Sequence, residues 1–336
     1  MRNMYEWLKA MKASKAKRPM PILSFPGIQL LGISVKDLIY SSDNQAKMML
    51  EVSRRIPTAA SVSMMDLSVE AEAFGSTVRF SDDEVPTVVG KIVSSLEDAQ
   101  RLEVPRMGAK RTGIYVEAVE KAVKLIGDRP VFAGAIGSFS LAGRLVDVTE
   151  AMINCYEEPE MMKAVLDKCT DFIIEYIKEF KKAGASGVII AEPLTGLLSL
   201  SLAEEFSEPY IKKIVDSVQD ENFIVVYHNC GNSTINIIES ILRTGSAAYH
   251  FGNSIDMEKM LEHIPPETVV FGNIDPAGQF KNGTPESIRA ATLELLSRCS
   301  KYPNFVISSG CDIPPLSKWE NIDAFFKAVE DFYKGA

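Results

Sequence analysis

The amino-acid sequence predicts an α/β fold, a (β/α)8 TIM barrel with extra N-terminal helices. Eight short apolar or β-branched runs, each bounded by Gly, Pro or Asn, recur along the 336 residues, and eight is the strand number of this closed barrel. Amphipathic stretches with apolar residues at helical spacing lie between the runs, and from residue 130 onward the two alternate regularly. Strands that alternate with helices pair in parallel through right-handed crossovers.

The predicted elements follow in chain order. The strands cover residues 19–25, 58–64, 130–136, 187–192, 223–228, 246–251, 268–274 and 304–309. An amphipathic helix is expected within residues 1–18, and residues 65–129 form a long excursion between the second and third strands. No linker, repeat or low-complexity tract divides the sequence, so residues 1–336 are predicted to form a single domain.

A doubly wound sheet is the main alternative to the barrel. Such a sheet usually carries a nucleotide-binding fingerprint, and no predicted strand is followed by G-x-G-x-x-G or by a P-loop. The run GAIGSFSLAG (134–143) is rich in glycine but has the wrong spacing. The sequence therefore favours the barrel.

Composition and charge narrow the class of protein. Hydrophobic residues make up 46% and charged residues 24%, which is typical of a soluble globular protein, and no apolar run is long enough to span a bilayer. The basic residues 1–19 have neither a continuous apolar core nor a small-residue cleavage site, which disfavours a signal peptide. We expect a cytoplasmic protein without membrane contact. A net charge of −9 also argues against nucleic-acid binding, which needs a basic surface.

The five cysteines divide into two groups. Their odd number argues against a disulfide framework and favours buried, reactive or metal-bound thiols. Cys155, Cys169 and Cys299 lie in helix-like stretches, where small buried hydrophobes are the simplest interpretation. Cys230 and Cys311 instead lie directly behind predicted strands, in the runs VVYHNCGN and ISSGCDIPP.

His228 completes a possible metal site with these two cysteines. In a strand, residues i and i+2 point the same way, so His228 and Cys230 can both face the barrel axis. Barrel enzymes place their chemistry at the C-terminal rim of the strands, where Cys311 is also expected. Three protein ligands with an open fourth position are the pattern of catalytic zinc. The H-x-C pattern alone is unspecific, but together with Cys311 it predicts a Zn²⁺ site.

The charge of this ligand set restricts the chemistry. Two thiolates cancel the charge of the dication, which disfavours activation of water for hydrolysis. A substrate thiol suits the fourth position better, because it would be held deprotonated and electron-rich enough to attack an alkyl carbon. The predicted reaction is S-alkylation. Alcohol dehydrogenases also use a Cys₂His zinc, but they need a dinucleotide fold that is not predicted here.

Three further residues are expected at the same rim. Glu192 closes the fourth strand and is a candidate fourth ligand, a partner of a ligand or a base, with a solvated loop carboxylate as the alternative. His250 ends the sixth strand and either approaches the metal or is a hydrogen-bonded structural histidine. Asp66 follows the second strand, where an Asx turn or helix cap competes with a catalytic role.

With these residues in view, the chain resembles the uroporphyrinogen decarboxylase superfamily, and within it the cobalamin-dependent methyltransferase branch. The matching stretches are MDLSVEAEAFGSTVRF (65–80), GAIGSFSLAGRL (134–145), AGASGVIIAEPLTGLLS (183–199), HNCG (228–231) and SGCDIPP (309–315). The resemblance covers nearly the whole chain. In that branch, an H-x-C pattern and a distant cysteine supply catalytic zinc, which carries over to His228, Cys230 and Cys311.

The decarboxylase branch fits less well. Its members carry a basic segment after the first strand, where this chain has FPGIQLLG (25–32), and a histidine after the last strand, where this chain has Cys311. Asp66 does match the aspartate that the decarboxylases use on the porphyrinogen. The methyltransferase pattern departs at Leu200, where the usual LLSP reads LLSL.

The resemblance implies a zinc-dependent methyltransferase that moves a methyl group from a methylated corrinoid protein to a zinc-activated thiol such as coenzyme M, another small thiol or a folate-type acceptor. The chain lacks the D-x-H-x-x-G signature of a corrinoid-binding domain, so cobalamin is expected on a partner protein. No basic cluster identifies a sulfonate or carboxylate acceptor, and Arg144 is one candidate contact. Glu192 and Asp66 are the catalytic candidates. The alternatives are a cofactor-free decarboxylase of the uroporphyrinogen type and a non-catalytic module that binds zinc or a corrinoid protein.

Overall fold

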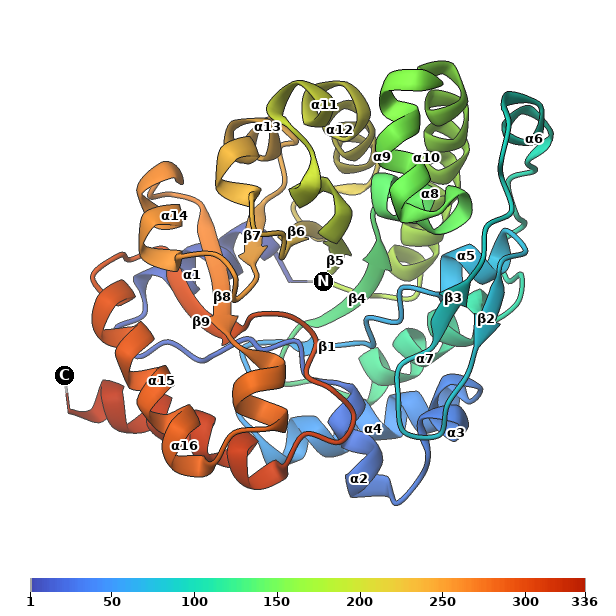
Figure 1. The fold of residues 1–336 in the computed structure, drawn as a ribbon. Helices are drawn as coiled ribbons and strands as arrows, with labels where there is room; N and C mark the ends of the chain where they lie inside the picture. The colour runs from blue at the N-terminus through green and yellow to red at the C-terminus, as the bar shows by residue number, and fades with distance from the viewer. Residues whose placement is uncertain (1, 336) are drawn as a thin grey trace.

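The computed structural model describes residues 2–335 and has an α/β, TIM-barrel-like fold (Figure 1). Its main sheet has seven parallel strands in the order β1-β4-β5-β6-β7-β8-β9. Their bounds are Ser61–Val62, Val131–Ile136, Gly187–Ala191, Ile224–Asn229, Ala248–Phe251, Val269–Ile274 and Phe305–Ser309. Seven of the eight predicted strands are therefore confirmed.

Helices surround the curled sheet (Figure 1). In the first half of the chain they are α1 (Met4–Ala13), α2 (Ile28–Leu31), α3 (Val35–Ile39), α4 (Ser42–Arg55), α5 (Val69–Ala73), α6 (Leu96–Arg101), α7 (Thr112–Leu125), α8 (Ser138–Val146) and α9 (Val148–Glu157). In the second half they are α10 (Pro159–Lys182), α11 (Leu200–Phe206), α12 (Glu208–Val218), α13 (Ile238–Arg243), α14 (Met257–His263), α15 (Pro285–Cys299) and α16 (Trp319–Lys334). Single helical turns are η1 (Phe25–Gly27), η2 (Pro193–Leu197), η3 (Thr234–Ile237) and η4 (Pro276–Lys281).

The excursion predicted for residues 65–129 is present. It contains α5, α6, α7 and a separate antiparallel hairpin of β2 (Thr77–Arg79) and β3 (Thr87–Val89). None of the helices among residues 2–335 combines the length and the apolar character needed to cross a membrane.

The predicted strand over residues 19–25 is wrong, although this segment occupies the position of an eighth strand. Met20 donates its amide to Ile307 of β9, 3.1 Å away, and Pro19 accepts from Ala59, just before β1, at 2.9 Å. The segment thus fills the gap between the first and last strands of the sheet. Pro19 and Pro21 have no amide hydrogen to donate to a ladder, so the chain runs extended without forming a regular strand.

The barrel interior is apolar at the end opposite the strand-end rim. Side chains from alternate strand positions, among them Phe132, Ile189, Val226 and Val306, form a buried cluster there with Met4 and the other apolar residues of α1. Alternation along a strand places every second residue on this inner face. His228, two residues beyond Val226 in β6, therefore lies on the same face but nearer the rim.

Candidate metal centre

His228, Cys230 and Cys311 come together at the rim. His228 is near the end of β6, Cys230 follows that strand directly, and Cys311 lies two residues beyond the end of β9. Their ligand atoms all lie within 4.8 Å of one another. Gly252 makes room for this approach, since a Cβ there would lie 2.3 Å from the Cβ of Cys230. The residues predicted as zinc ligands are thus gathered in one place.

A chain of hydrogen bonds behind His228 sets its tautomer. The Ser308 hydroxyl donates to the carbonyl of Met20 at 2.7 Å, so it accepts from Nε2 of His250, 2.9 Å away. Burial lowers the pKa of His250 well below its usual value, and this neutral ring has only its Nδ1 left to accept. His228 Nδ1 lies 2.8 Å from that atom and therefore donates to it. The lone pair of His228 is consequently on Nε2.

The ligand atoms fit a soft divalent cation. His228 is 1% exposed, and its Nε2 is buried with no hydrogen-bond partner within residues 2–335. The neighbouring thiol of Cys311 lowers the pKa of Cys230, whereas the thiol of Cys230 and burial raise the pKa of Cys311 to about 12. One imidazole and two sulfurs are the donors of known catalytic zinc sites, and a cation would allow both thiols to ionise.

His250 does not join the three ligand residues. It is fully buried on β7, opposite His228 in the register of the two strands. Both of its ring nitrogens are engaged, one with His228 and one with Ser308. Of the two interpretations of His250, the hydrogen-bonded structural histidine matches these contacts.

Glu192 is also turned away from the three ligand residues. Its carboxylate accepts from the amides of Phe139 and Ser140 at 2.9 Å each, from the Ser140 hydroxyl at 2.7 Å and from Thr195 at 3.2 Å. Burial nevertheless raises the pKa of Glu192 to about 7. These contacts fix the N-terminus of α8 against the end of β5, so the residue orders the rim.

Asp66 belongs to a separate buried cluster. Its carboxylate accepts from Arg111, from the Tyr115 hydroxyl at 2.6 Å and from the Ser68 amide and hydroxyl at 3.1 and 2.6 Å. Arg111 also donates to Glu72 at 2.7 Å. The bond to the Ser68 amide is the Asx-type contact expected as the alternative to catalysis.

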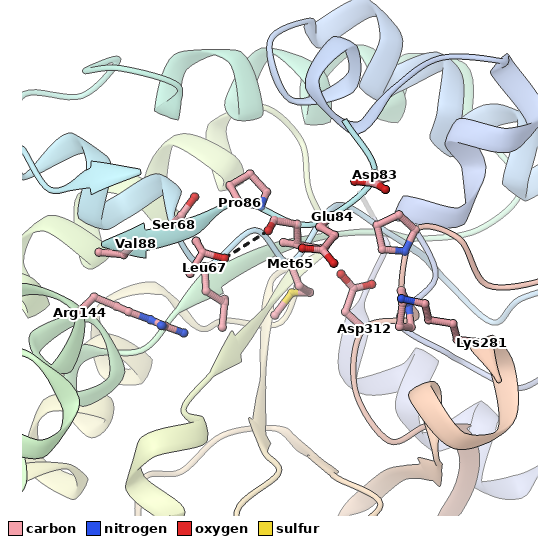
Figure 2. A pocket seen from close by; sticks show the side chains of 14 residues that line it. Met65, Leu67, Ser68, Asp83, Glu84, Pro86, Val88, Arg144, Lys281 and Asp312 are labelled. Carbon is pink, nitrogen blue, oxygen red and sulfur yellow. Dashed lines mark hydrogen bonds between the residues drawn. The ribbon is translucent and has the colours of Figure 1, made fainter. Parts of the chain in front are cut away.

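Two adjoining cavities open at the rim. The inner cavity, about 100 Å³, is lined by His228, Cys230 and Cys311 together with Ile22, Met65, Leu67, Ala191, Pro193 and Asp312. The outer cavity, about 400 Å³, shares Met65, Leu67 and Asp312 with it and extends to Arg144, Lys281 and residues 83–88, which include the start of β3. Figure 2 shows the outer cavity with Arg144 on one side and Asp312 and Lys281 on the other. The outer cavity therefore adjoins the inner one, which contains the two cysteines.

Sequence reasoning missed three residues of this region. Asp312 lines both cavities and was recognisable only as the neighbour of Cys311 in the GCDIPP turn. Ser308 is one residue before the end of the predicted strand 304–309, and alternation with Val306 placed it on the inner face. Arg111 comes from the excursion, where no local pattern pointed to Asp66.

Known proteins similar to this chain include both methyltransferases and decarboxylases. Over 271 residues the chain is 27% identical to the methylcobamide:CoM methyltransferase MtbA of Methanosarcina acetivorans, covering 80% of this chain and 78% of that protein. It is 28% identical over 310 residues to the uroporphyrinogen decarboxylase of Hydrogenovibrio crunogenus, covering 89% and 86%. A solved methyltransferase from Methanosarcina mazei shares the fold, with a TM-score of 0.84 at 23% identity over 99% of this chain and 100% of that one.

The family itself is shown by a match that spans most of the sequence. The uroporphyrinogen decarboxylase (URO-D) family profile matches residues 20–332, which takes in every strand of the main sheet and both cavities. The chain belongs to the uroporphyrinogen decarboxylase family.

Proposed function

We propose that this protein is a zinc-dependent methyltransferase that moves a methyl group from a methylated corrinoid protein to a thiol acceptor such as coenzyme M. The observation that carries the proposal is the unpartnered Nε2 of His228, which lies with the sulfurs of Cys230 and Cys311 at the edge of a cavity. Similarity to a methylcobamide:CoM methyltransferase supports the reaction class.

The residues would divide the work as follows. His228, Cys230 and Cys311 would hold the zinc, which when bound would supply a Lewis acid that keeps an acceptor thiol deprotonated near neutral pH. His250 and Ser308 hold the imidazole of His228 in the tautomer whose Nε2 is free. Ile22, Leu67 and Pro193 line the inner cavity and limit the access of water to the acceptor sulfur.

The proposal assigns Glu192 and Asp66 supporting roles. Glu192 holds the N-terminus of α8 at the rim through its contacts with Phe139 and Ser140. Asp66 and Arg111 hold the start of the excursion. Neither carboxylate is part of the lining of the inner or the outer cavity, so the decarboxylase chemistry that would use Asp66 has less support.

The deciding experiment measures metal and methyl transfer together. Purified protein is expected to contain about one zinc per chain, and it should demethylate methylcobalamin only when a thiol is added. A new zinc–sulfur bond at about 2.3 Å, detected by X-ray absorption after thiol addition, would identify the acceptor class. Chelator-insensitive release of carbon dioxide from uroporphyrinogen would instead establish the decarboxylase. Tight zinc binding without alkylation of any thiol would identify a binding module.

A further inference from the structure

Within the described residues 2–335, three arginines are largely buried, and two of them are fully paired. Arg111, whose side chain is 2% exposed, binds Asp66 and Glu72. Arg129, whose side chain is 8% exposed, binds Asp128 at 2.7 Å and the carbonyls of Ile56 and Ser53 at 2.8 and 2.9 Å. Both follow the rule that a buried charge is compensated by partners inside the protein.

Arg144 breaks this rule. Its Nε is buried without a hydrogen-bond partner, and no ion pair joins it to any acid within residues 2–335. Burial lowers its pKa, and no neighbouring charge contributes to that shift. An arginine nonetheless stays protonated in proteins, so the chain keeps a partly desolvated cation with no counter-charge of its own.

The fold holds this cation at the wall of the outer cavity. Arg144 lies in the last turn of α8, whose first turn is fixed by Glu192. The carbonyl of Leu145 accepts from the amides of Ile92 and Val93 at 2.8 and 3.1 Å, which ties the end of the helix to the loop beyond β3. In Figure 2 the guanidinium of Arg144 extends into the cavity, toward Met65.

The rest of the cavity lining does not neutralise it. Asp83, Glu84 and Asp312 also line the cavity, but none of them contributes to the pKa shift of Arg144. Lys281 is the other cation, and it is solvent-exposed, so water already solvates its charge. An ion pair with an anionic ligand should therefore stabilise Arg144 more than Lys281.

We propose that Arg144 is the specificity-determining residue of the acceptor pocket, and that it pairs with a sulfonate or carboxylate on the acceptor thiol. The proposal rests on the function proposed above and names the acceptor class. The two cavities share Met65, Leu67 and Asp312, so an acceptor that occupies both would have its sulfur beside Cys230 and Cys311 and its anionic group beside Arg144. The planar guanidinium offers two parallel donors to either anion.

The test compares four small thiols as acceptors, with methylcobalamin as donor. They are 2-mercaptoethanesulfonate, 3-mercaptopropionate, neutral 2-mercaptoethanol and cationic 2-aminoethanethiol. We expect the native protein to prefer an anionic thiol, and the sulfonate and carboxylate arms show which anion is used. Arg144→Gln should lower kcat/KM for the preferred anionic thiol by roughly 10- to 100-fold, as expected for loss of a charged hydrogen bond. Its kcat/KM for 2-mercaptoethanol should change less than about threefold.

Two further variants make the result specific. Arg144→Lys keeps a point charge and should recover part of the preference, whereas a purely structural role for Arg144 would reduce all four thiols alike. Lys281→Gln should keep the preference for the anion. The proposal is overturned if Lys281→Gln abolishes the preference while Arg144→Gln leaves it unchanged, or if 2-aminoethanethiol is the best acceptor.

A binding measurement separates this inference from the proposed reaction. Ethanesulfonate and propionate lack the sulfur, and saturation-transfer NMR can follow their binding to the metal-free protein. We expect one of them to bind native protein and to lose that binding in Arg144→Gln. Absence of methyl transfer to every thiol would refute the reaction alone. Anion binding that persists in Arg144→Gln would refute the role of Arg144 alone.

Discussion

Two buried polar clusters of this protein differ in one respect. In the Asp66 cluster, Asp66 accepts from Arg111, Tyr115 and Ser68, and Arg111 also binds Glu72. In the His228 cluster, Nε2 has no hydrogen-bond partner among residues 2–335 and lies beside two thiols that line a cavity. Buried polar atoms that hydrogen-bond to one another stabilise a fold. Several potential ligand atoms that point to one place and lack such partners instead indicate a binding site. The difference separates a structural unit from a candidate catalytic one.

The largest expected effect comes from removing a proposed metal ligand from the His228 cluster. Cys311→Ser should abolish stoichiometric zinc and lower thiol methylation by more than about 100-fold, because even loss of a residue that only supports a ligand costs roughly 10- to 100-fold. Zinc content and methylcobalamin demethylation measure both effects. Cys155→Ser, on α9 and outside both cavities, is the matched control and should retain zinc. Full zinc in Cys311→Ser would contradict the ligand assignment.

A substitution in the Asp66 cluster should instead lower the stability of the fold. Arg111→Met leaves the buried carboxylate of Asp66 without its cation, which should lower the free energy of unfolding by about 3–5 kcal/mol. Zinc content at temperatures below the transition should stay unchanged. Urea denaturation measures the effect, and adding Asp66→Asn to Arg111→Met should restore part of the loss because it removes the unpaired charge. Loss of zinc with unchanged stability in Arg111→Met would contradict the structural role of the Asp66 cluster.

His250 is not one of the three proposed ligands but contacts one of them, His228. His250→Phe removes the acceptor of the His228 Nδ1 proton, so His228 can adopt the other tautomer and zinc affinity should fall roughly 10- to 100-fold. Competition with a chromogenic chelator measures the affinity, and nitrogen NMR of the imidazole reports the tautomer. Ser308→Ala should have a smaller effect of the same sign. An unchanged affinity in His250→Phe would show that the hydrogen-bond chain does not matter for the metal.

The smallest effect concerns the pH dependence of folding. Glu70 is buried, one of its oxygens has no partner within residues 2–335, and burial raises its pKa to about 7. Its folded pKa lies above the unfolded value of about 4.3, so its contribution to stability is complete below that value and is lost as pH rises to about 7. Glu70→Gln cannot ionise and should lose less stability over this range, by on the order of 1–3 kcal/mol.

The measurement for Glu70 compares the two proteins at each pH. Contributions from zinc and from other titrating groups cancel in the difference between the unfolding free energies of Glu70→Gln and the native protein. That difference should favour the variant increasingly from about pH 4.5 to about pH 7. A difference that is constant with pH would show that Glu70 has an ordinary pKa in the folded state.

The sequence allowed the strands and the metal candidates to be predicted for a common reason. Parallel strands bring their ends to one rim, so His228, Cys230 and Cys311 could be grouped despite their separation in the chain. The contacts of Glu192 could not be predicted the same way. A carboxylate at a strand end can face either the cavity or a neighbouring helix, and its donors on Phe139 and Ser140 come from α8.

Other features depended on contacts that no local pattern encodes. The apolar run at 19–25 looked like a strand, but Pro19 and Pro21 remove the donors that a ladder requires. The pairing of Arg111 with Asp66 joins two parts of the excursion that are 45 residues apart. The free guanidinium of Arg144 could be recognised only once the surrounding acids were known.

The proline-containing segment between β9 and β1 has a consequence for the proposed metal binding. The series of hydrogen bonds that begins at His228 ends at the carbonyl of Met20, and the amide of Met20 donates to the carbonyl of Ile307. Segments with few backbone hydrogen bonds open locally at low free-energy cost. If zinc binds at this site as proposed, we expect its rate of release to follow hydrogen exchange at the amides of Met20 and Ile22.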